Sequence, residues 1–441
     1  MNTILLQPID VLFFRDGRPM EGSLAGHGAA WPLPNVTDAA FHAALHRSGL
    51  NGHAHDQRSG ADRHGEDNRR FGSLVTAGPF PVQFARRHGD PWPEPRWFFP
   101  RPLDLLDDTL RPALAPTDTF DLSRSSLRNE PLRYPVANRL APSKEHPARA
   151  WLSTQAYQAY LTDSSSPPGA SDTSDDSEIF DAEAAVGIAI DAETGTTGQG
   201  EATGKIYSAR YLRLRDDWRL GVFAQTAEKN SSPDRKDLIP DLINERQQLL
   251  VGGQQRLCTA VLCNSKLLPV PHGKTGGFHE HNGKRLVKWI LLSPAIWPEI
   301  PAQAQDGRPM TPHCGGWLPN WVRQEDGQVM LRSGQRQRRT YAGKHRRGFG
   351  DDSKEIDARL VAALVPKPIV VTGWALANDT DRVEGGAKSS HLAVPAGAVY
   401  YFEANSPEAA VALVNALNWH GATEGMEIKN RRSTLMGEKG F

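Results

Sequence analysis

Apolar and polar positions alternate most clearly near the middle of the chain, between residues 185 and 214. Two strand-like arms, 186–191 and 205–214, flank a stretch rich in glycine and threonine. Glycine permits positive φ angles and leaves the tip between the arms mobile. The pattern predicts a long β-hairpin around which the rest of the chain is organised.

The N-terminal segment predicts a strand followed by a helix. Residues 3–14 are apolar and β-branched enough for a buried strand, with Pro8 at a bulge or an edge. A helix follows, because Phe41 and Leu45 lie on one apolar stripe at helical spacing. Its candidate capping residues are Asn35, Thr37 and Asp38.

The C-terminal part predicts further strands and one helix. Apolar runs at 286–292, 368–376 and 397–403 are typical of strands. Ser406 can cap a helix whose first position is Pro407, and proline is favoured there because its missing N–H has no helical partner.

Three polar stretches interrupt these elements and are predicted to be insertions: 51–70, 163–183 and 301–355. The third carries a basic cluster, which is either a solvated run or a contact with RNA or another subunit. Its basic residues are Arg332, Arg336, Arg338, Arg339, Lys344, Arg346 and Arg347.

Composition limits the classes of protein. The 441 residues suffice for two or three domains, and 51 basic residues balance 51 acidic ones, so a nucleic-acid site must be a local patch. Three cysteines without a CxxC motif indicate a reducing compartment and argue against structural zinc. The sequence has no signal-peptide pattern and no apolar run of roughly 20 residues. We therefore expect a cytoplasmic protein that makes no membrane contact.

Basic and aromatic residues share the second arm of the hairpin. Cations offset phosphate charge while aromatic rings stack on bases, so this combination suits RNA. A solvated sheet edge is the alternative. The residues concerned are Lys205, Tyr207, Arg210, Tyr211 and Arg213.

A second candidate site is the sequence LLVGGQQR at 249–256, which resembles a strand entering a glycine turn. Gly252 and Gly253 would let the backbone approach a ligand closely, and Arg256 could bind a phosphate. A tight turn followed by a strand fits the same residues.

Motifs for other chemistry are incomplete. Two stretches imitate a phosphate-binding loop, but Gln199 and Leu268 replace the first glycine of each. His42 and His46 have the spacing of a zinc pair, although Ala43 replaces the required glutamate. We therefore predict no catalytic residue, no metal site and no cofactor, while a histidine-dependent ribonuclease stays open.

Several blocks together resemble one family. They are ILLQPIDVLFFRDGRPM, the central hairpin, LLVGGQQR, PAGAVYYFE and the glycine-containing C-terminal end. This combination resembles the third subunit of Cmr-type (type III-B) CRISPR effector complexes, which belongs to the RAMP superfamily.

The resemblance implies an α+β fold of two ferredoxin-like (RRM-like) halves, with the hairpin as a thumb and the polar stretches as insertions. The halves would be residues 1–240, with insertions near 51–70 and 163–183 and the thumb at 185–214, and residues 241–441, with the basic insertion at 301–355. It also implies binding of the 5′ handle of the CRISPR RNA, contacts with the large polymerase-like subunit and a backbone subunit, and indirect contact with target RNA.

Carried onto this chain, the resemblance adds Arg15 and Arg18 to the candidate RNA contacts named above. The main hypothesis is a non-catalytic RNA-binding subunit. One alternative is a metal-independent endoribonuclease that processes precursor CRISPR RNA, with His27 as its candidate general base. A protein scaffold without RNA contacts is the other.

Overall fold

The structure is a computed structural model that covers the whole chain. The residues it describes are 1–14, 24–25, 31–48, 74–84, 95–106, 110, 112, 114–117, 131–138, 148–162, 169, 171–188, 190–191, 193–197, 206–226, 237–245, 247–263, 269–271, 273, 276–281, 283–300, 312–333, 336–341, 344–349, 354–372, 374–375, 386–387 and 390–417. Within them, the chain combines helices and sheets, as predicted, and the sheets are mostly antiparallel.

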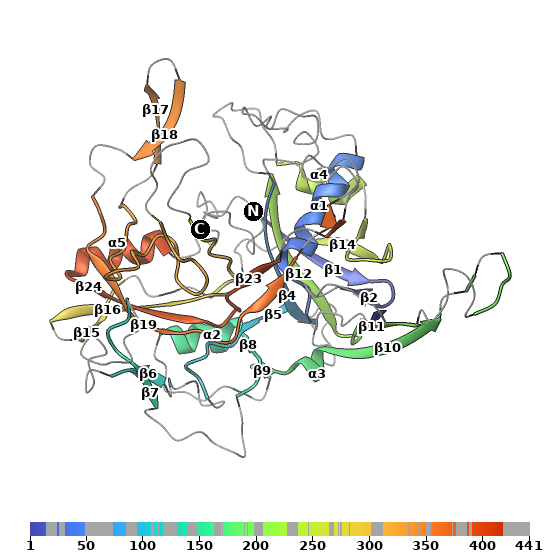
Figure 1. Ribbon diagram of the computed structural model, residues 1–441, viewed down its shortest axis with the longest axis horizontal. Helices are drawn as coiled ribbons and strands as arrows, with labels where there is room; N and C mark the ends of the chain where they lie inside the picture. Colours follow the sequence, from blue (N-terminus) through green and yellow to red (C-terminus); the bar gives the residue numbers. More distant parts are fainter. Residues whose placement is uncertain are drawn as a thin grey trace, which may run out of the picture.

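The largest sheet has eight strands, and every neighbouring pair is antiparallel (Figure 1). In spatial order they are β13 (Gln248–Leu250), β14 (Leu257–Cys263), β1 (Asn2–Pro8), β12 (Trp218–Thr226), β4 (Leu74–Phe84), β5 (Pro95–Pro100), β8 (Trp151–Ser153) and β9 (Thr173–Ser174).

Two helices cover one face of this sheet. Helix α1 (Pro34–Arg47) lies in the chain between β1 and β4, and α4 (Ile239–Glu245) lies between β12 and β14. Their apolar residues, among them Phe41 and Leu242, share one buried cluster with Ile4 of β1. Since side chains alternate along a strand, every second residue of β1 and β12 enters this core.

The opposite face of the sheet packs against helix α2 (Thr154–Leu161) and the C-terminal part of the chain. Leu5 and Phe223 point into this second core, where they meet Tyr157 of α2 and Val270. In Figure 1, α2 lies next to β5 and β8, on the side of the sheet that faces the C-terminal part of the chain. This core therefore joins the N-terminal and C-terminal parts.

The C-terminal sheet has the order β15 (His279–His281), β16 (Lys284–Ile290), β24 (Val399–Ala404) and β19 (Ala358–Leu364). Helix α5 (Pro407–Leu417) packs on it through Ala410 and Leu413. The N–H of Ala409 donates a 3.1 Å hydrogen bond to Ser406 Oγ, which confirms the predicted cap.

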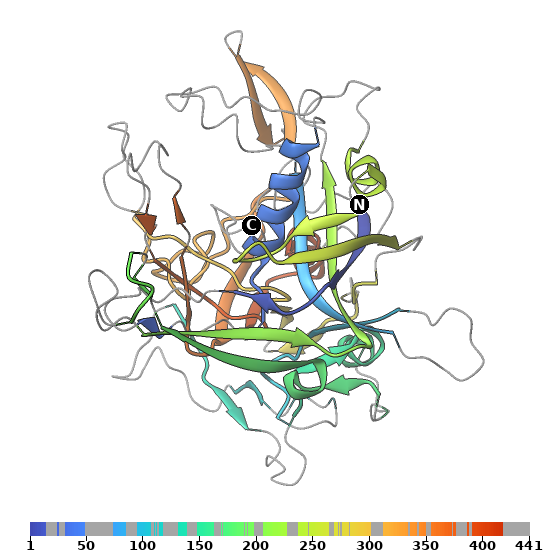
Figure 2. The ribbon, with the colours of Figure 1, turned by 90° about the vertical axis from the view of Figure 1, so that its right-hand side faces the viewer.

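The central hairpin comprises β10 (Phe180–Ile188) and β11 (Ile206–Leu214), which pair antiparallel from Phe180–Leu214 to Ile188–Ile206. Strand β11 also pairs with β2 (Leu12–Phe13) and, in parallel, with β3 (Leu24–Ala25). In Figure 2 the two long green strands run next to each other across the front of the lower part of the molecule.

Short elements complete the described fold. The two-stranded ribbons are β6 (Leu114–Pro116) with β7 (Val136–Asn138), β17 (Arg336–Tyr341) with β18 (Lys344–Phe349), β20 (Ile369–Val371) with β23 (His391–Ala393), and β21 (Trp374–Ala375) with β22 (Gly386–Ala387). A one-turn helix, α3 (Asp176–Ile179), precedes β10.

Two predictions made from the sequence differ from the structure. The predicted capping residues of α1 were wrong, because the N-cap is Leu33, and Thr37 Oγ1 instead donates to the carbonyl of Pro34. Pro34 starts the helix with its fixed φ and missing N–H, so a side-chain cap is less needed. The acidic stretch 163–183 contains β9, α3 and the start of β10, whereas 51–70 lies outside the described residues.

No helix that the structure describes is long and apolar enough to cross a membrane.

Candidate nucleic-acid interface

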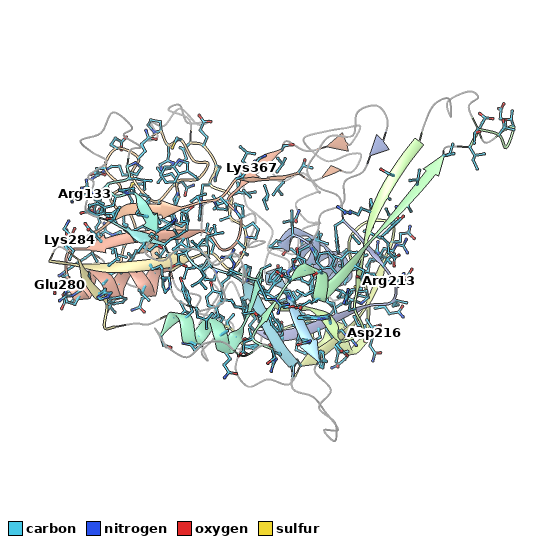
Figure 3. The ribbon with its side chains drawn as sticks, turned by 90° about the horizontal axis from the view of Figure 1, so that it is seen from below. Arg133, Arg213, Asp216, Glu280, Lys284 and Lys367 are labelled. Atoms are coloured by element: carbon cyan, nitrogen blue, oxygen red, sulfur yellow. The ribbon has the colours of Figure 1, made fainter. Side chains whose placement is uncertain are left out.

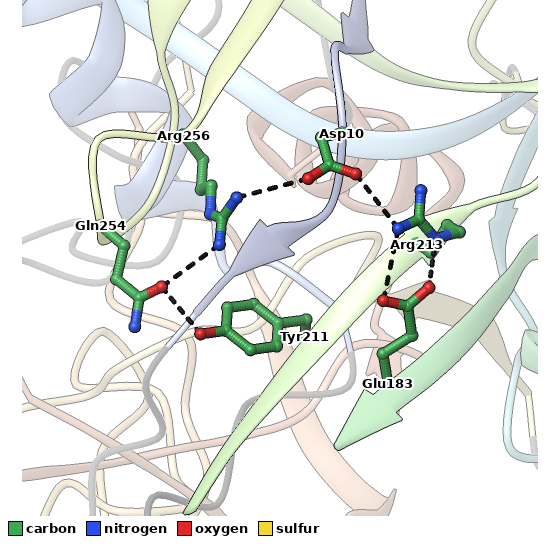
Figure 4. A network of polar contacts seen from close by, with 6 residues as sticks. All are labelled: Asp10, Glu183, Tyr211, Arg213, Gln254 and Arg256. Atoms are coloured by element: carbon green, nitrogen blue, oxygen red, sulfur yellow. Dashed lines mark hydrogen bonds and ion pairs between the residues drawn. The ribbon is translucent and has the colours of Figure 1, made fainter. Parts of the chain in front are cut away.

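Three segments that are far apart in the sequence meet at the base of the hairpin. Phe13 of β2, Tyr211 of β11 and the loop 251–256 between β13 and β14 lie side by side. Figure 4 shows Tyr211 next to Gln254 and Arg256 of this loop. The meeting is set by pairing, since β2 hydrogen-bonds to β11 and β14 hydrogen-bonds to β1, which precedes β2. The site therefore combines the hairpin with the glycine loop.

The two glycines of the loop allow a very close backbone approach. The N–H of Gly253 donates a 2.9 Å hydrogen bond to the carbonyl oxygen of Phe13. Gly252 has φ +80°, and a Cβ at this position would lie 2.5 Å from the same oxygen. The sequence predicted that these two glycines let the backbone approach a ligand closely. In the structure, this side of the loop instead approaches the backbone of Phe13 in the same chain.

The tip of the loop holds two consecutive non-glycine residues in the left-handed region. Gln254 has φ 56° and Gln255 has φ 54°, and both are exposed. The N–H of Arg256 donates to the carbonyl of Gly253 at 3.4 Å, which closes a turn of the type normally built from Asn-Gly. Each such residue costs about 1–2 kcal/mol, and strain of this kind clusters at functional sites.

We expect Gln255→Gly to raise the free energy of unfolding by about 1 kcal/mol, because glycine adopts this φ without strain. Chemical denaturation measures the change. Gln248→Gly is the matched control, since Gln248 is an exposed strand residue, and the same replacement there should destabilise. Equal destabilisation by both variants would contradict the assignment of strain.

Tyr211 connects the loop to the hairpin. Its ring centroid lies 5.6 Å from that of Phe13, and its hydroxyl donates a 3.0 Å hydrogen bond to Gln254 Oε1. The guanidinium carbon of Arg256 lies 5.1 Å from the Tyr211 ring centroid, within range of a cation–π contact. The ring is therefore held in place on two sides.

Ion pairs balance the charge of the cluster. Arg256 Nη1 lies 3.5 Å from Asp10 Oδ2, and Arg213 Nη2 lies 3.1 Å from Asp10 Oδ1. Arg213 also pairs with Glu183 across the hairpin, and this hydrogen bond raises the pKa of the guanidinium. Two arginines thus face two carboxylates, so phosphate binding here would require exchange of partners.

The structure brings together four of the nine predicted contacts: Tyr211, Gly252, Gly253 and Arg256. Arg210 is exposed and, by strand alternation, lies on the opposite face of β11 from Tyr211. Tyr207 pairs with Gly187 nearer the tip. The structure does not describe the side chain of Tyr207. Outside the described residues lie Arg15, Arg18 and Lys205, as well as the alternative general base His27.

Sequence reasoning missed three members of the cluster: Asp10, Phe13 and Gln254. Gln254 gave no signal, because glutamine is not a residue preferred at positive φ. Asp10 and Arg256 are 246 positions apart, so only the strand register brings them together.

One face of the hairpin carries an exposed apolar stripe. Val186 is 72% exposed and Ile188 is 54% exposed, and the stripe continues to Ile190 at 64%. Arg210 pairs with Ala184 and so shares this face. Figure 3 shows β10 and β11 running past the labelled Arg213 and away from the body.

The hairpin tip is closed by side-chain hydrogen bonds. Asp191 Oδ1 accepts the N–H groups of Glu193 at 3.1 Å and Thr194 at 2.9 Å, which lowers the pKa of the carboxyl. Gly195 follows with φ +65°. The described part of the tip is therefore a defined turn.

Among the residues with described positions, no group of three or more His, Cys, Asp or Glu side chains is placed to hold a metal ion.

Comparison with known proteins identifies the class. Residues 4–430 match the family model described as CRISPR-associated protein (Cas_Cmr3). Because the match spans nearly the whole sequence, the chain belongs to the Cas_Cmr3 family, the third subunit of Cmr-type (type III-B) CRISPR effector complexes within the RAMP superfamily. Among curated proteins, none matches this sequence.

Solved structures to which the chain is similar include two chains of type III-B Cmr-beta. One, bound to cognate target RNA and AMPPnP, is 15% identical over 90% of this chain and 86% of its own, with a TM-score of 0.41. The other, bound to cognate target RNA, is 17% identical over 91% and 86%, with a TM-score of 0.39. A chain of a type III-A Csm3-Csm4 subcomplex is 9% identical over 91% and 92%, with a TM-score of 0.35.

Proposed function

We propose that this chain binds and caps the 5′ handle of the CRISPR RNA in a type III-B effector complex, without itself catalysing a reaction. In this role it contacts the large polymerase-like subunit and a backbone subunit, and meets target RNA only indirectly. One observation carries the proposal: in a member of this family, a strained, exposed turn and a hairpin aromatic form a single cluster.

The cluster offers groups suited to a phosphate and a base. Arg256 is 3.5 Å from Asp10, and an ion pair of partly exposed groups at this distance is worth at most about 1 kcal/mol. A phosphate can therefore replace Asp10 as the partner of Arg256 at small cost and gain charge-assisted hydrogen bonds. Arg15 and Arg18 follow Phe14 closely in sequence, so we include them among the proposed contacts.

The hairpin is proposed to act as a thumb at the guide-target duplex. Its exposed stripe of Val186 and Ile188 offers apolar surface to unstacked bases, while Arg210 on the same face can meet the backbone. Tyr207 pairs with Gly187 and so belongs to the other face of the hairpin, the face of Tyr211. We include it, together with Lys205, among the proposed RNA contacts.

Two ferredoxin-like halves, residues 1–240 and 241–441, are part of the proposal. The order β14-β1-β12-β4, with α1 and α4 as the intervening helices, supports this fold for the first half, because βαββαβ units give this arrangement. Since β14 ends at Cys263, the first half in this arrangement extends past residue 240 to residue 263. For the second half, the order β16-β24-β19 with α5 supports three strands and one helix of the unit.

Charge reversal at Arg256 tests the handle site. We expect Arg256→Glu to weaken handle RNA binding on the order of tenfold, since a charged hydrogen bond is removed and the introduced carboxylate repels phosphate together with Asp10. Binding is measured by titrating labelled handle RNA into the assembled complex at several salt concentrations.

The matched control is Arg323→Glu, because Arg323 is also exposed and paired, in this case with Asp326. It should leave handle affinity unchanged. If Arg256→Glu binds RNA as the wild type does, and the response to salt is flat, the chain is a scaffold and the proposed handle site is wrong.

A further inference from the structure

The ribbon β17–β18 concentrates basic residues in a segment that the handle site does not use. Residues 336–349 contain five arginines and Lys344, and no acidic residue. The strands pair antiparallel from Arg336–Phe349 to Tyr341–Lys344. Both Figure 1 and Figure 2 place the ribbon at the top of the molecule, well away from hairpin β10–β11.

The register sets residues of like charge opposite each other. Arg338 pairs with Arg347, and the next position pairs Arg339 with Arg346. Like charges directly across a sheet destabilise it, and a lone two-stranded ribbon is only marginally stable in water. The register therefore sets positively charged residues at opposite positions, where a bound anion would offset the repulsion between them.

The chain segments immediately before and after the ribbon are joined by antiparallel backbone hydrogen bonds. The N–H of Ser333 donates to the carbonyl of Lys354 at 2.8 Å, and the N–H of Ile356 donates to that of Leu331 at 2.9 Å. Leu331 and Ile356 are buried in the C-terminal core. In these segments, Arg332 faces an acidic partner, Glu355, at 3.5 Å. The residues at the base of the ribbon are therefore held to the C-terminal core.

Strand alternation distributes the arginine pairs over both faces. Consecutive residues of a strand lie on opposite faces, so the pair Arg338–Arg347 lies on one face and the pair Arg339–Arg346 on the other. An acidic protein surface would cover one face of a ribbon. Phosphates on both sides suit a nucleic acid, whose backbones can flank an inserted element.

We propose that ribbon β17–β18 is a second RNA-binding site, which holds phosphodiester backbones on both of its faces without reading sequence. Single-stranded and duplex RNA share this chemistry. This inference rests on the proposed function only because both require that the complex binds RNA. The ribbon residues differ from those of the handle site, and the salt dependence measured here differs from the handle affinity measured there.

The test compares the complex carrying the wild-type chain with one carrying four replacements, R338Q, R339Q, R346Q and R347Q. Probes are a labelled uridine homopolymer and a labelled RNA duplex, both without the handle. Because four phosphate-neutralising cations are removed, the slope of log affinity against log salt should fall by about 3, and affinity at moderate salt should fall on the order of tenfold.

Three controls keep the outcome interpretable. Lysine at the same four positions should retain most of the slope, and K367Q with R215Q removes two exposed charges elsewhere and should leave it nearly unchanged. The thermal midpoint of the glutamine variant should not fall, because repulsion is removed. The probe that the wild-type complex binds more tightly shows whether the ribbon prefers single-stranded or duplex RNA.

An unchanged slope in the glutamine variant would overturn the proposal. Loss of a neighbouring subunit from the complex, with RNA affinity intact, would also overturn it and make the ribbon a protein contact. Failure of the handle proposal would give a different result. The wild-type complex would then bind RNA with and without the handle equally well, while the salt slope of the ribbon variants would still change.

Discussion

Gly252→Ala is expected to lower the free energy of unfolding by about 2–4 kcal/mol and to abolish handle binding. The backbone φ of +80° costs alanine about 1–2 kcal/mol. In addition, the new methyl group would lie 2.5 Å from the carbonyl oxygen of Phe13, and no rotamer change relieves a contact with backbone. The loop must then separate from β2, which removes the support of Tyr211 and Arg256.

Chemical denaturation and a handle-binding titration measure the two effects. Gly277→Ala is the matched control, because Gly277 has a similar φ of +67° and a Cβ there meets nothing within 4 Å. This control should cost only the backbone preference and leave RNA binding unchanged. Equal losses in both variants would mean that the close approach to Phe13 does not matter.

Lys288→Met is expected to destabilise the joint between the two parts of the chain by about 3–5 kcal/mol, because it leaves a buried carboxylate unpaired. Asp104 is completely buried and accepts hydrogen bonds from Lys288 Nζ at 2.9 Å and from the Tyr160 hydroxyl at 2.7 Å. Burial and the neighbouring Asp104 raise the pKa of Tyr160, so its hydroxyl keeps its proton and continues to donate.

Arg323→Met provides the comparison, since Arg323 and Asp326 form a more exposed pair, and its loss should cost about 1 kcal/mol or less. The double variant Asp104→Asn, Lys288→Met should recover much of the loss by removing the stranded charge. Thermal unfolding and denaturant titration report both. If Lys288→Met costs no more than Arg323→Met, the buried network does not hold the parts together.

Local patterns predicted the elements that local interactions determine. The β-then-α start, the Ser406 cap and the pairing of 186–188 with 206–208 all depend on residues close in sequence. Pro34 shows the limit, because its effect on the helix start outweighed three good capping residues that follow it.

The candidate site could be predicted only in part. Glycine and arginine at 252–256 and tyrosine at 211 carry recognisable chemistry, so the sequence selected them. Their neighbours Asp10 and Gln254 enter through strand register and a strained turn, neither of which leaves a local signal. The sequence indicated a basic hairpin. In the structure, Arg213 and Arg256 pair with the carboxylates of Asp10 and Glu183, so the described base of the hairpin is nearly neutral.

The strand register also separates the two kinds of basic surface. At the hairpin base, arginines face acids and keep the cluster ordered, whereas on ribbon β17–β18 arginines are paired with arginines in the register. We therefore expect salt to affect the ribbon more steeply than the handle site, where strained backbone and aromatic contacts contribute as well.

The most direct test of the central claim incubates the protein with end-labelled CRISPR RNA, with and without the 5′ handle, first in chelator and then in magnesium. Gels report binding and cutting together. The proposed function predicts retention that depends on the handle and RNA that stays intact in both conditions. Cleavage that persists in chelator and is lost in His27→Ala would contradict it and make the chain a processing ribonuclease.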